Sequence, residues 1–496
     1  MKRFLALVLT VILSMGLFAT AGIAEGDSSP ITMVLSEVGN NLDPIIANYI
    51  DTSTMMQHIY DNILHVDTDF NLIPGIVSAW NQPDGTTIEL TMGEGFVFHN
   101  GEPLEMEDLM YALERAEHVA EMAATWEKIE SLTSEGNVMT IKLKQPDNGF
   151  LRGLAELPVM NKSYCQSMGE GYANAPVGTG PYKVAQYVPG DRLVLEAWAD
   201  YPFEKAIIPQ ITFIGITESA AKYMAVEAGD AQFSQISYAD FNRAQSNDKI
   251  ATFEGPTTST SFVSMNVTAA PFDDVNVRQA MAYAYNKEGY KNLATYNMFS
   301  IDSMFLLDSA YYSSSEYAIT YNPEKAKELL EAAGYNESTP LSFVVAGYGG
   351  ENPMMLAYQA DLMAIGVNVT LENYEFGTFL NLMMNQEYQM LTGSWGNTVG
   401  DPLSSAASYW SESFGSMNIS FFVSERCDEL YNTALVSVDE AEIQAACAEI
   451  QDIAWQEVPI IPTYGRYQSF AYDKDLTGMV ISPSGIISFR TASYVK

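Results

Sequence analysis

The sequence has few of the residues that build disulfide frameworks, metal centres and nucleophilic active sites. Three cysteines among 496 residues, Cys165, Cys427 and Cys447, are too few for a fold held together by disulfides. The four histidines form no H-E-x-x-H motif and no Cys/His spacing suited to zinc. The sequence also contains no G-x-S-x-G elbow, P-loop or dinucleotide fingerprint. These absences argue against an enzyme, and we expect no metal and no cofactor.

Basic residues are scarce as well. Lysine and arginine number 24 against 62 aspartates and glutamates, a net charge of −38. That charge disfavours electrostatic binding to nucleic acid or to an anionic membrane surface. Because 47% of the residues are hydrophobic and 17% charged, the chain can bury large cores. At about 150 residues per domain it should form roughly three domain-sized units.

Long apolar runs are absent beyond the N-terminus. Residues 1–24 combine Lys2 and Arg3, an apolar run from Phe4 to Phe18, and small residues up to Ala24. This order is typical of a secretory signal peptide, and the run is short for a bilayer span. No cysteine follows it to accept a lipid anchor. We expect an exported protein, periplasmic or on the extracellular face of the envelope, without direct membrane insertion.

Two questions stay open on composition alone. With 62 acidic residues, a secreted hydrolase that uses paired carboxylates is an alternative to a non-catalytic protein. If Asp428–Val436 and Asp439–Gln456 form a helical hairpin, Cys427 and Cys447 lie about equally far from its turn. They are then either bridged or two buried free thiols.

Short strands and helices alternate through the rest of the chain. Ile31–Leu35, Leu193–Trp198 and Ile211–Ile214 are predicted strands, and Ser219–Ala228 is a predicted helix that ends at Gly229. Thr86–Met92 and Phe96–His99 are expected to pair around Gly93–Gly95. Such alternation predicts an α/β protein whose sheets are covered by helices in more than one lobe.

Several motifs occur in a fixed order along nearly the whole chain beyond residue 24. They are Leu42–Pro44, His58–Leu64, Ile73–Trp80, Phe96–Asp108, Gly178–Tyr182, Pro271–Ala280, Tyr321–Ala326 and Pro459–Pro462. In sequence and spacing this set resembles the extracytoplasmic solute-binding proteins of ABC importers, in the oligopeptide, dipeptide and nickel-binding class (bacterial solute-binding protein family 5). Most of these motifs suit structural roles, such as helix caps and tight turns, better than ligand contacts.

The resemblance implies a two-lobed, periplasmic-binding-protein-like fold of the class II type, with a hinge. Lobe I would comprise residues 25–264, with an extra subdomain at about 61–175, and lobe II residues 265–467. Residues 468–496 would return to lobe I. The implied function is to capture a small solute between the lobes, without catalysis, and to deliver it to the membrane subunits of an ABC permease. We expect the protein to act as a monomer.

The resemblance also points to Gly393–Pro402, because the family places the residues after a G-x-W-like strand in the interlobe cleft. Trp395 would offer a flat apolar face, although a core indole is the alternative. Peptide-binding members carry an aspartate shortly after this tryptophan, which holds the ligand's α-ammonium. Here Asn397 and Thr398 occupy that region. Either Asp401 replaces the missing aspartate or the ligand lacks an α-ammonium.

Further candidates lie where the two lobes should meet. Asn48 and Tyr49 follow the first strand, and Tyr464 and Arg466 lie near the last crossing between lobes. Arg466 suits a ligand carboxylate, with a structural ion pair as the alternative. The leading ligand is a short peptide. An oligosaccharide, an opine or a metal chelate is the alternative within the same fold.

Overall fold

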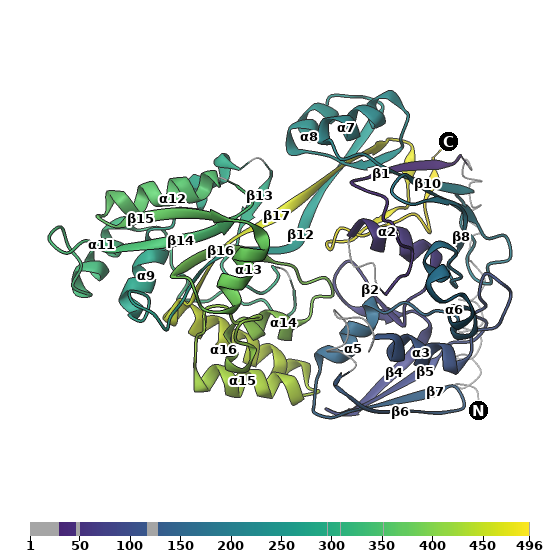
Figure 1. The fold of residues 1–496 in the computed structure, drawn as a ribbon, viewed down its shortest axis with the longest axis horizontal. Helices are drawn as coiled ribbons and strands as arrows, with labels where there is room; N and C mark the ends of the chain where they lie inside the picture. Colours follow the sequence, from purple (N-terminus) through teal and green to yellow (C-terminus); the bar gives the residue numbers. More distant parts are fainter. Residues whose placement is uncertain are drawn as a thin grey trace, which may run out of the picture.

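The computed structural model describes residues 29–45, 50–116, 127–294, 296–307, 309–350 and 352–495. The expected signal peptide at residues 1–24, together with Asn48 and Tyr49, lies outside the described residues. Strands β12 (Ile250–Met265) and β17 (Ile460–Asp473) run through both of the two lobes (Figure 1). The α/β, two-lobed fold expected from the sequence is therefore confirmed.

One large mixed sheet extends through the molecule because β12 and β17 belong to both lobes. Its strands follow the order β15-β14-β16-β12-β17-β11-β1-β10-β9-β8, and β13 pairs with β17. Parallel pairing of β1 with β10 and β11 is flanked by antiparallel strands. The bounds are β1 (Ile31–Leu35), β8 (Tyr182–Val188), β9 (Arg192–Ala197), β10 (Gln210–Gly215), β11 (Phe233–Gln235), β13 (Met298–Ser300), β14 (Ser342–Tyr348), β15 (Asn368–Tyr374) and β16 (Met390–Trp395).

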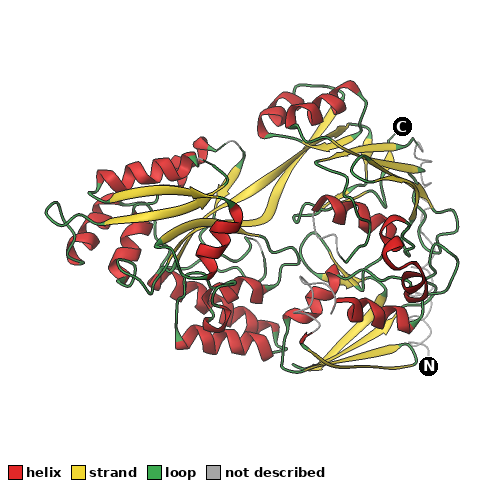
Figure 2. Cartoon of the chain, in the orientation of Figure 1, coloured by secondary structure: helices red, strands yellow, loops and turns green. Residues whose placement is uncertain are grey.

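Helices cover the sheet in each lobe (Figure 2). Lobe I contains α2 (Ile50–Ile59), α3 (Met106–Ala116), α5 (Gly149–Gly153), α6 (Lys162–Met168), α7 (Ser219–Ala228) and α8 (Tyr238–Ala244). Lobe II contains α9 (Val275–Tyr283), α10 (Lys287–Tyr290), α11 (Pro323–Ala332), α12 (Pro353–Ala364), α13 (Phe376–Met384), α14 (Pro402–Ala406), α15 (Glu425–Val436) and α16 (Glu440–Glu457). Among the described residues, no helix is long and apolar enough to cross a membrane.

A separate sheet with the order β4-β5-β7-β6 lies in the region expected to form the extra subdomain. Its strands are β4 (Val77–Asp84), β5 (Thr87–Met92), β6 (Ile129–Glu135) and β7 (Val138–Leu143), and the hairpin of β2 (Leu64–Val66) and β3 (Leu72–Pro74) lies beside them. The expected pairing of Thr86–Met92 with Phe96–His99 is wrong, because β5 pairs with β4 and β7. Phe96–His99 instead turns back on Glu102–Leu104 around Gly101, whose φ of +87° suits glycine.

The hydrophobic cores separate at the crossing strands. Phe253 packs on the lobe I core, whereas Phe262, nine residues further along β12, belongs to a lobe II core. Pairing between β12 and β17 shifts register between Pro256 and Thr260. The domain boundary predicted after residue 264 thus falls at the lobe II end of β12, a few residues beyond this register shift.

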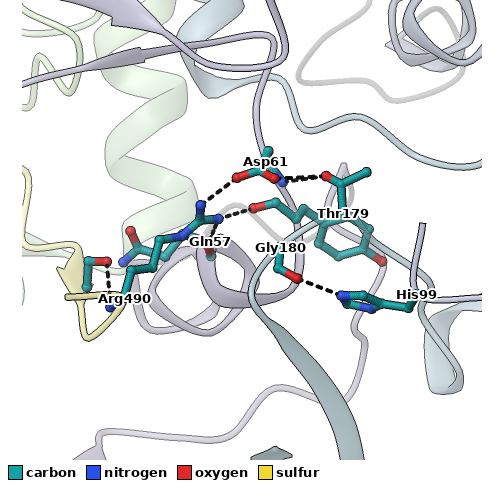
Figure 3. A network of polar contacts seen from close by, with 8 residues as sticks. Gln57, Asp61, His99, Thr179, Gly180 and Arg490 are labelled. Carbon is teal, nitrogen blue, oxygen red and sulfur yellow. Dashed lines mark hydrogen bonds and ion pairs between the residues drawn. The ribbon is translucent and has the colours of Figure 1, made fainter. Parts of the chain in front are cut away.

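A polar network shows what the recognisable motifs do (Figure 3). The Arg490 guanidinium pairs with the Asp61 carboxylate and donates to the Tyr60 carbonyl. The Thr179 hydroxyl donates to the same carboxylate, and the His99 ring nitrogen Nε2 donates to the Gly180 carbonyl. Three motifs that are far apart in sequence thereby hold the C-terminal segment on lobe I. The segment includes the short strands β18 (Leu476–Thr477), β19 (Val480–Ile481), β20 (Ile487–Ser488) and β21 (Ser493–Tyr494).

All three cysteines are buried free thiols, so the structure contains no bridge between Cys427 and Cys447. The two residues lie on α15 and α16, and the expected helical hairpin is confirmed. Burial raises the pKa of the Cys427 thiol to about 11, which disfavours the reactive thiolate.

Gly178→Ala should destabilise the protein strongly, by more than about 2 kcal/mol, because the new Cβ would lie 2.0 Å from the Ile59 carbonyl oxygen. Gly153→Ala is the matched control. No atom lies within 4 Å of its Cβ position, and the residue has helical geometry. The control should be neutral or stabilising by up to about 1 kcal/mol. Thermal unfolding of both variants checks this, and equal melting temperatures would contradict the packing role of Gly178.

Candidate functional site

A cavity of about 680 Å³ lies between the lobes. Lobe I lines it with the carboxyl ends of β1 and β11, which is where ligands bind in open α/β sheets. The crossing strands contribute Thr257–Ser259 and Arg466–Phe470, and lobe II contributes Tyr296, Asn297, Gly396 and Thr398. The cavity therefore has walls from both lobes and from the crossing.

The charged side chains that line the cavity are mostly positive, whereas the chain as a whole is strongly negative. Among the described residues, the charged ones that line it are Asp51, Lys222 and Arg466. Two cations and one carboxylate thus line the cavity of a protein with 62 acidic and 24 basic residues. Such a cavity favours a ligand that carries at least one carboxylate or another anionic group.

Arg466 has no acidic partner in the part of the chain that the structure describes. Its guanidinium carbon lies 4.5 Å from the centre of the Tyr296 ring. Stacking of this kind orients the planar group and leaves its N–H donors available. Within the described residues, Arg466 therefore does not form the structural ion pair that was the alternative to a ligand contact.

Asp51 and Lys222 lie at the lobe I side of the cavity. Asp51 Oδ2 accepts hydrogen bonds from the backbone N–H groups of Ser36 at 2.8 Å and Glu37 at 3.2 Å. Lys222 Nζ donates to the Ser36 hydroxyl at 2.8 Å. Burial lowers the pKa of Lys222, and the nearby Asp51 opposes that shift. The second oxygen of Asp51 accepts no hydrogen bond from the described residues, so it can receive a ligand donor.

The structure brings two of the predicted site residues, Thr398 and Arg466, to this cavity. Asn397 instead closes its own loop, since its side chain bonds the backbone N–H and the carbonyl of Asp401. Tyr464 lies in the lobe II core, where its hydroxyl donates to the Lys287 carbonyl at 2.9 Å. It does not line the cavity, because β17 is still inside lobe II at this residue.

Trp395 ends β16 and packs against the lobe II core. Its ring lies 5.6 Å from that of Phe262, and it does not line the interlobe cavity. The indole N–H is buried and has no hydrogen-bond partner among the described residues. This placement favours the core alternative over a direct ligand contact.

Asp401 is the N-cap of α14, and its carboxylate accepts from the backbone N–H groups of Leu403 and Ser404. It faces Gly149 of lobe I and does not line the interlobe cavity. Burial, reinforced by the negative charge of Asp147, raises the pKa of Asp401 to about 6. The geometry gives no support to Asp401 as the substitute ammonium anchor, and Asp51 is the carboxylate that the cavity presents.

Asp51 and Lys222 were not among the site residues predicted from the sequence. A signal existed for Lys222, because it lies in the predicted helix Ser219–Ala228 beside Tyr223 and one turn before Val226, both of which are buried. A lysine on the apolar side of a helix needs a structural or functional reason. No such sequence signal existed for Asp51, because an acidic residue is common in the first turn of any helix.

Asp401→Asn should raise the melting temperature by a few degrees at pH 7.5 and by almost nothing at pH 4. Because the pKa of this acid is raised from 3.8 to about 6 in the fold, the ionised form carries a penalty above pH 6, on the order of 3 kcal/mol. That penalty disappears as pH falls through 6 towards 4. Asparagine also caps helices well, and Asp274→Asn, at the N-cap of α9, controls for the change of cap. A gain in melting temperature that is the same at both pH values would contradict the shifted pKa.

Comparison with known proteins identifies the class. The profile of the family described as "Bacterial extracellular solute-binding proteins, family 5 Middle" matches residues 71–416. The chain belongs to this family. It is therefore the extracytoplasmic, non-catalytic solute-binding component of an ABC importer and works with the importer's permease.

Among curated relatives, a glutathione-binding protein, GsiB, of Pectobacterium atrosepticum is 26% identical over 92% of both chains. GsiB of Escherichia coli is 25% identical over 92% of this chain and 94% of that protein. Among solved structures, HbpA2 of Haemophilus parasuis has a TM-score of 0.87 at 20% identity, covering 94% of this chain and all of that one. A Pseudoalteromonas dipeptide-binding protein in complex with Met-Leu has a TM-score of 0.77 at 19% identity, with 94% and 100% coverage. These two structures support the fold.

Proposed function

We propose that the protein binds a short peptide or a peptide-like solute in the interlobe cavity, with a free carboxylate of the ligand on Arg466. The proposal rests on an arginine that has no acidic partner among the described residues and that Tyr296 orients, in the cavity of a strongly acidic protein. A guanidinium in this state is suited to a bidentate contact with a carboxylate. The GsiB relatives are named as glutathione-binding proteins, and glutathione is a tripeptide with free carboxylates, which supports the same ligand class.

The ligand's ammonium group would lie by Asp51. Oδ2 of this carboxylate is held by two backbone N–H groups, so the side chain is fixed in place while Oδ1 remains available. Lys222 keeps the local charge close to neutral, which suits a zwitterion better than a dication. In this arrangement the ammonium anchor comes from lobe I rather than from the loop after Trp395.

Cavity size and wall composition fit this ligand class. A volume of about 680 Å³ lies within the range of about 300–1,000 Å³ usual for small-molecule sites. Because both lobes and the crossing strands line the cavity, a bound ligand would contact each of them. Such contacts stabilise the closed form relative to an open one, which is how a two-lobed binder captures its solute.

A non-peptide carboxylate, such as an opine, is the second candidate. It is favoured by the absence of an aspartate at Asn397 and Thr398 and by the position of Asp401 outside the cavity. A metal chelate has less support, since none of the described residues that line this cavity is a histidine.

Arg466→Gln should weaken the binding of a free-carboxylate peptide by roughly 10- to 100-fold, because a charge-assisted hydrogen bond contributes about 1.5–3 kcal/mol. Calorimetric titration with glutathione and with di- and tripeptides, each as the free acid and as the C-terminal amide, provides the measurement. The wild-type protein should prefer the acid, and the variant should lose that preference.

Arg243→Gln is the matched control, since Arg243 is an exposed arginine that pairs with Glu227 outside the cavity. It should bind like the wild type. The assignment of the carboxylate to Arg466 fails if wild-type protein binds acids and amides equally well, or if both arginine variants lose the same affinity.

A further inference from the structure

A second cavity, of about 410 Å³, adjoins the first along the crossing strands. The two cavities share Thr257, Thr258, Ser259, Tyr467 and Pro483 as lining residues. The shared strand segment lies where pairing between β12 and β17 is interrupted, between Pro256 and Thr260. A group that extends from a ligand in the first cavity past this segment would enter the second.

Lobe II gives the second cavity an apolar wall. Phe299 lies directly over Gly465, where a Cβ would come within 2.2 Å of its ring, and packs edge-on against Tyr467 with ring centres 5.0 Å apart. The same apolar wall includes Ile301, Leu306 and Leu307. Leu307 is 40% exposed, so its side chain offers apolar surface that a ligand group could cover.

Lobe I supplies the opposite wall through Phe70, in the turn between β2 and β3. Phe70 has φ of +62°, a conformation that is uncommon for residues other than glycine. Gly400, of lobe II, lies against it, and a Cβ there would be 2.7 Å from the Phe70 side chain. A strained backbone of this kind persists only where its surroundings hold it, and such positions cluster at functional sites.

Arg152 holds the Phe70 turn in place. Its Nη1 donates to the Phe70 carbonyl at 2.7 Å and to the Val399 carbonyl at 3.3 Å, and its Nη2 donates to the Tyr311 hydroxyl at 3.2 Å. Val399 and Tyr311 belong to lobe II, whereas Arg152 and Phe70 belong to lobe I. The second cavity is thus complete only when the lobes are closed, and one arginine links its two sides.

We propose that this second cavity is a side-chain subsite that selects ligands with an apolar side chain, with Phe70 and Leu307 as its specificity-determining residues. The inference rests on the proposed function, because it requires a ligand anchored in the first cavity. The occupant is an aliphatic or aromatic side chain, since apolar side chains of both lobes line the cavity beside the threonines and serine of the crossing, and Asp69 repels carboxylates. Arg152 is a positioning residue that keeps Phe70 at the subsite.

A tripeptide series tests the subsite. The peptides share free termini, and one residue at a time is varied among glycine, alanine, leucine, phenylalanine and glutamate; calorimetry gives the affinities. At one position of the series, wild-type affinity should rise roughly 10- to 100-fold from glycine to leucine or phenylalanine, as burial of such a side chain implies. Glutamate should bind no better than glycine.

Phe70→Ala and Leu307→Ser remove apolar surface from opposite lobes. Each should flatten the dependence on side-chain size by at least about fivefold while leaving the affinity for the glycine peptide nearly unchanged. Arg152→Met should flatten it as well, yet keep the preference for a free carboxylate over an amide. Phe376→Ala, an exposed phenylalanine that lines neither cavity, is the control and should match the wild type.

The outcomes separate the subsite from the proposed function. Binding of none of the peptides overturns the proposed function. Side-chain selectivity that survives in both Phe70→Ala and Leu307→Ser overturns the subsite while leaving the proposed function intact. Equal wild-type affinity for every peptide of the series also overturns the subsite.

Discussion

The pairing of β12 with β17 is the constraint on which the rest of the structure depends. Ile250–Pro256 pairs with Tyr467–Asp473 inside lobe I, and the continuing strands pair again inside lobe II. Between these stretches the register shifts, and Thr257–Ser259 lines both interlobe cavities. The interrupted pairing of β12 with β17 leaves a few residues that can absorb a change in lobe orientation. It also exposes main chain and short polar side chains to a ligand in the cavities.

Closure also has contacts of its own, remote from the main cavity. The Asn148 side chain donates to the Ala434 carbonyl at 3.1 Å, and its backbone N–H donates to the Leu435 carbonyl at 3.2 Å. These carbonyls end α15, where helices leave acceptors unsatisfied, so a residue of lobe I caps a helix of lobe II. At the edge of the main cavity, which Thr398 also lines, the Thr398 hydroxyl donates to Glu156 across the lobes. Ligand contacts therefore add to an interface that already exists, and they need only shift a balance between open and closed forms.

Local chemistry made much of the fold predictable from the sequence, and the site much less so. Asp274 caps α9, as a carboxylate before an apolar helix should, and the motifs fill structural roles in the network around Asp61. The full length of β12 escaped prediction because its Gly255-Pro256 step and threonine-rich stretch lack an alternating apolar pattern. Arg466 lines the cavity and lies near the crossing, a position that the sequence indicates, whereas only the tertiary fold brings Lys222 to the same cavity. The residue pattern of a single helix does not show whether that helix will face the cleft.

The interlobe cavity is proposed to hold a carboxylate-bearing solute against Arg466. A crystal structure of the exported protein with the solute that co-purifies with it, identified by mass spectrometry, tests this most directly. We expect a ligand carboxylate within hydrogen-bond distance of the Arg466 guanidinium, enclosed by both lobes, and a ligand donor group near Asp51. A ligand bound outside the cavity, or Arg466 paired with an acidic side chain of the protein while the cavity is occupied, would contradict it.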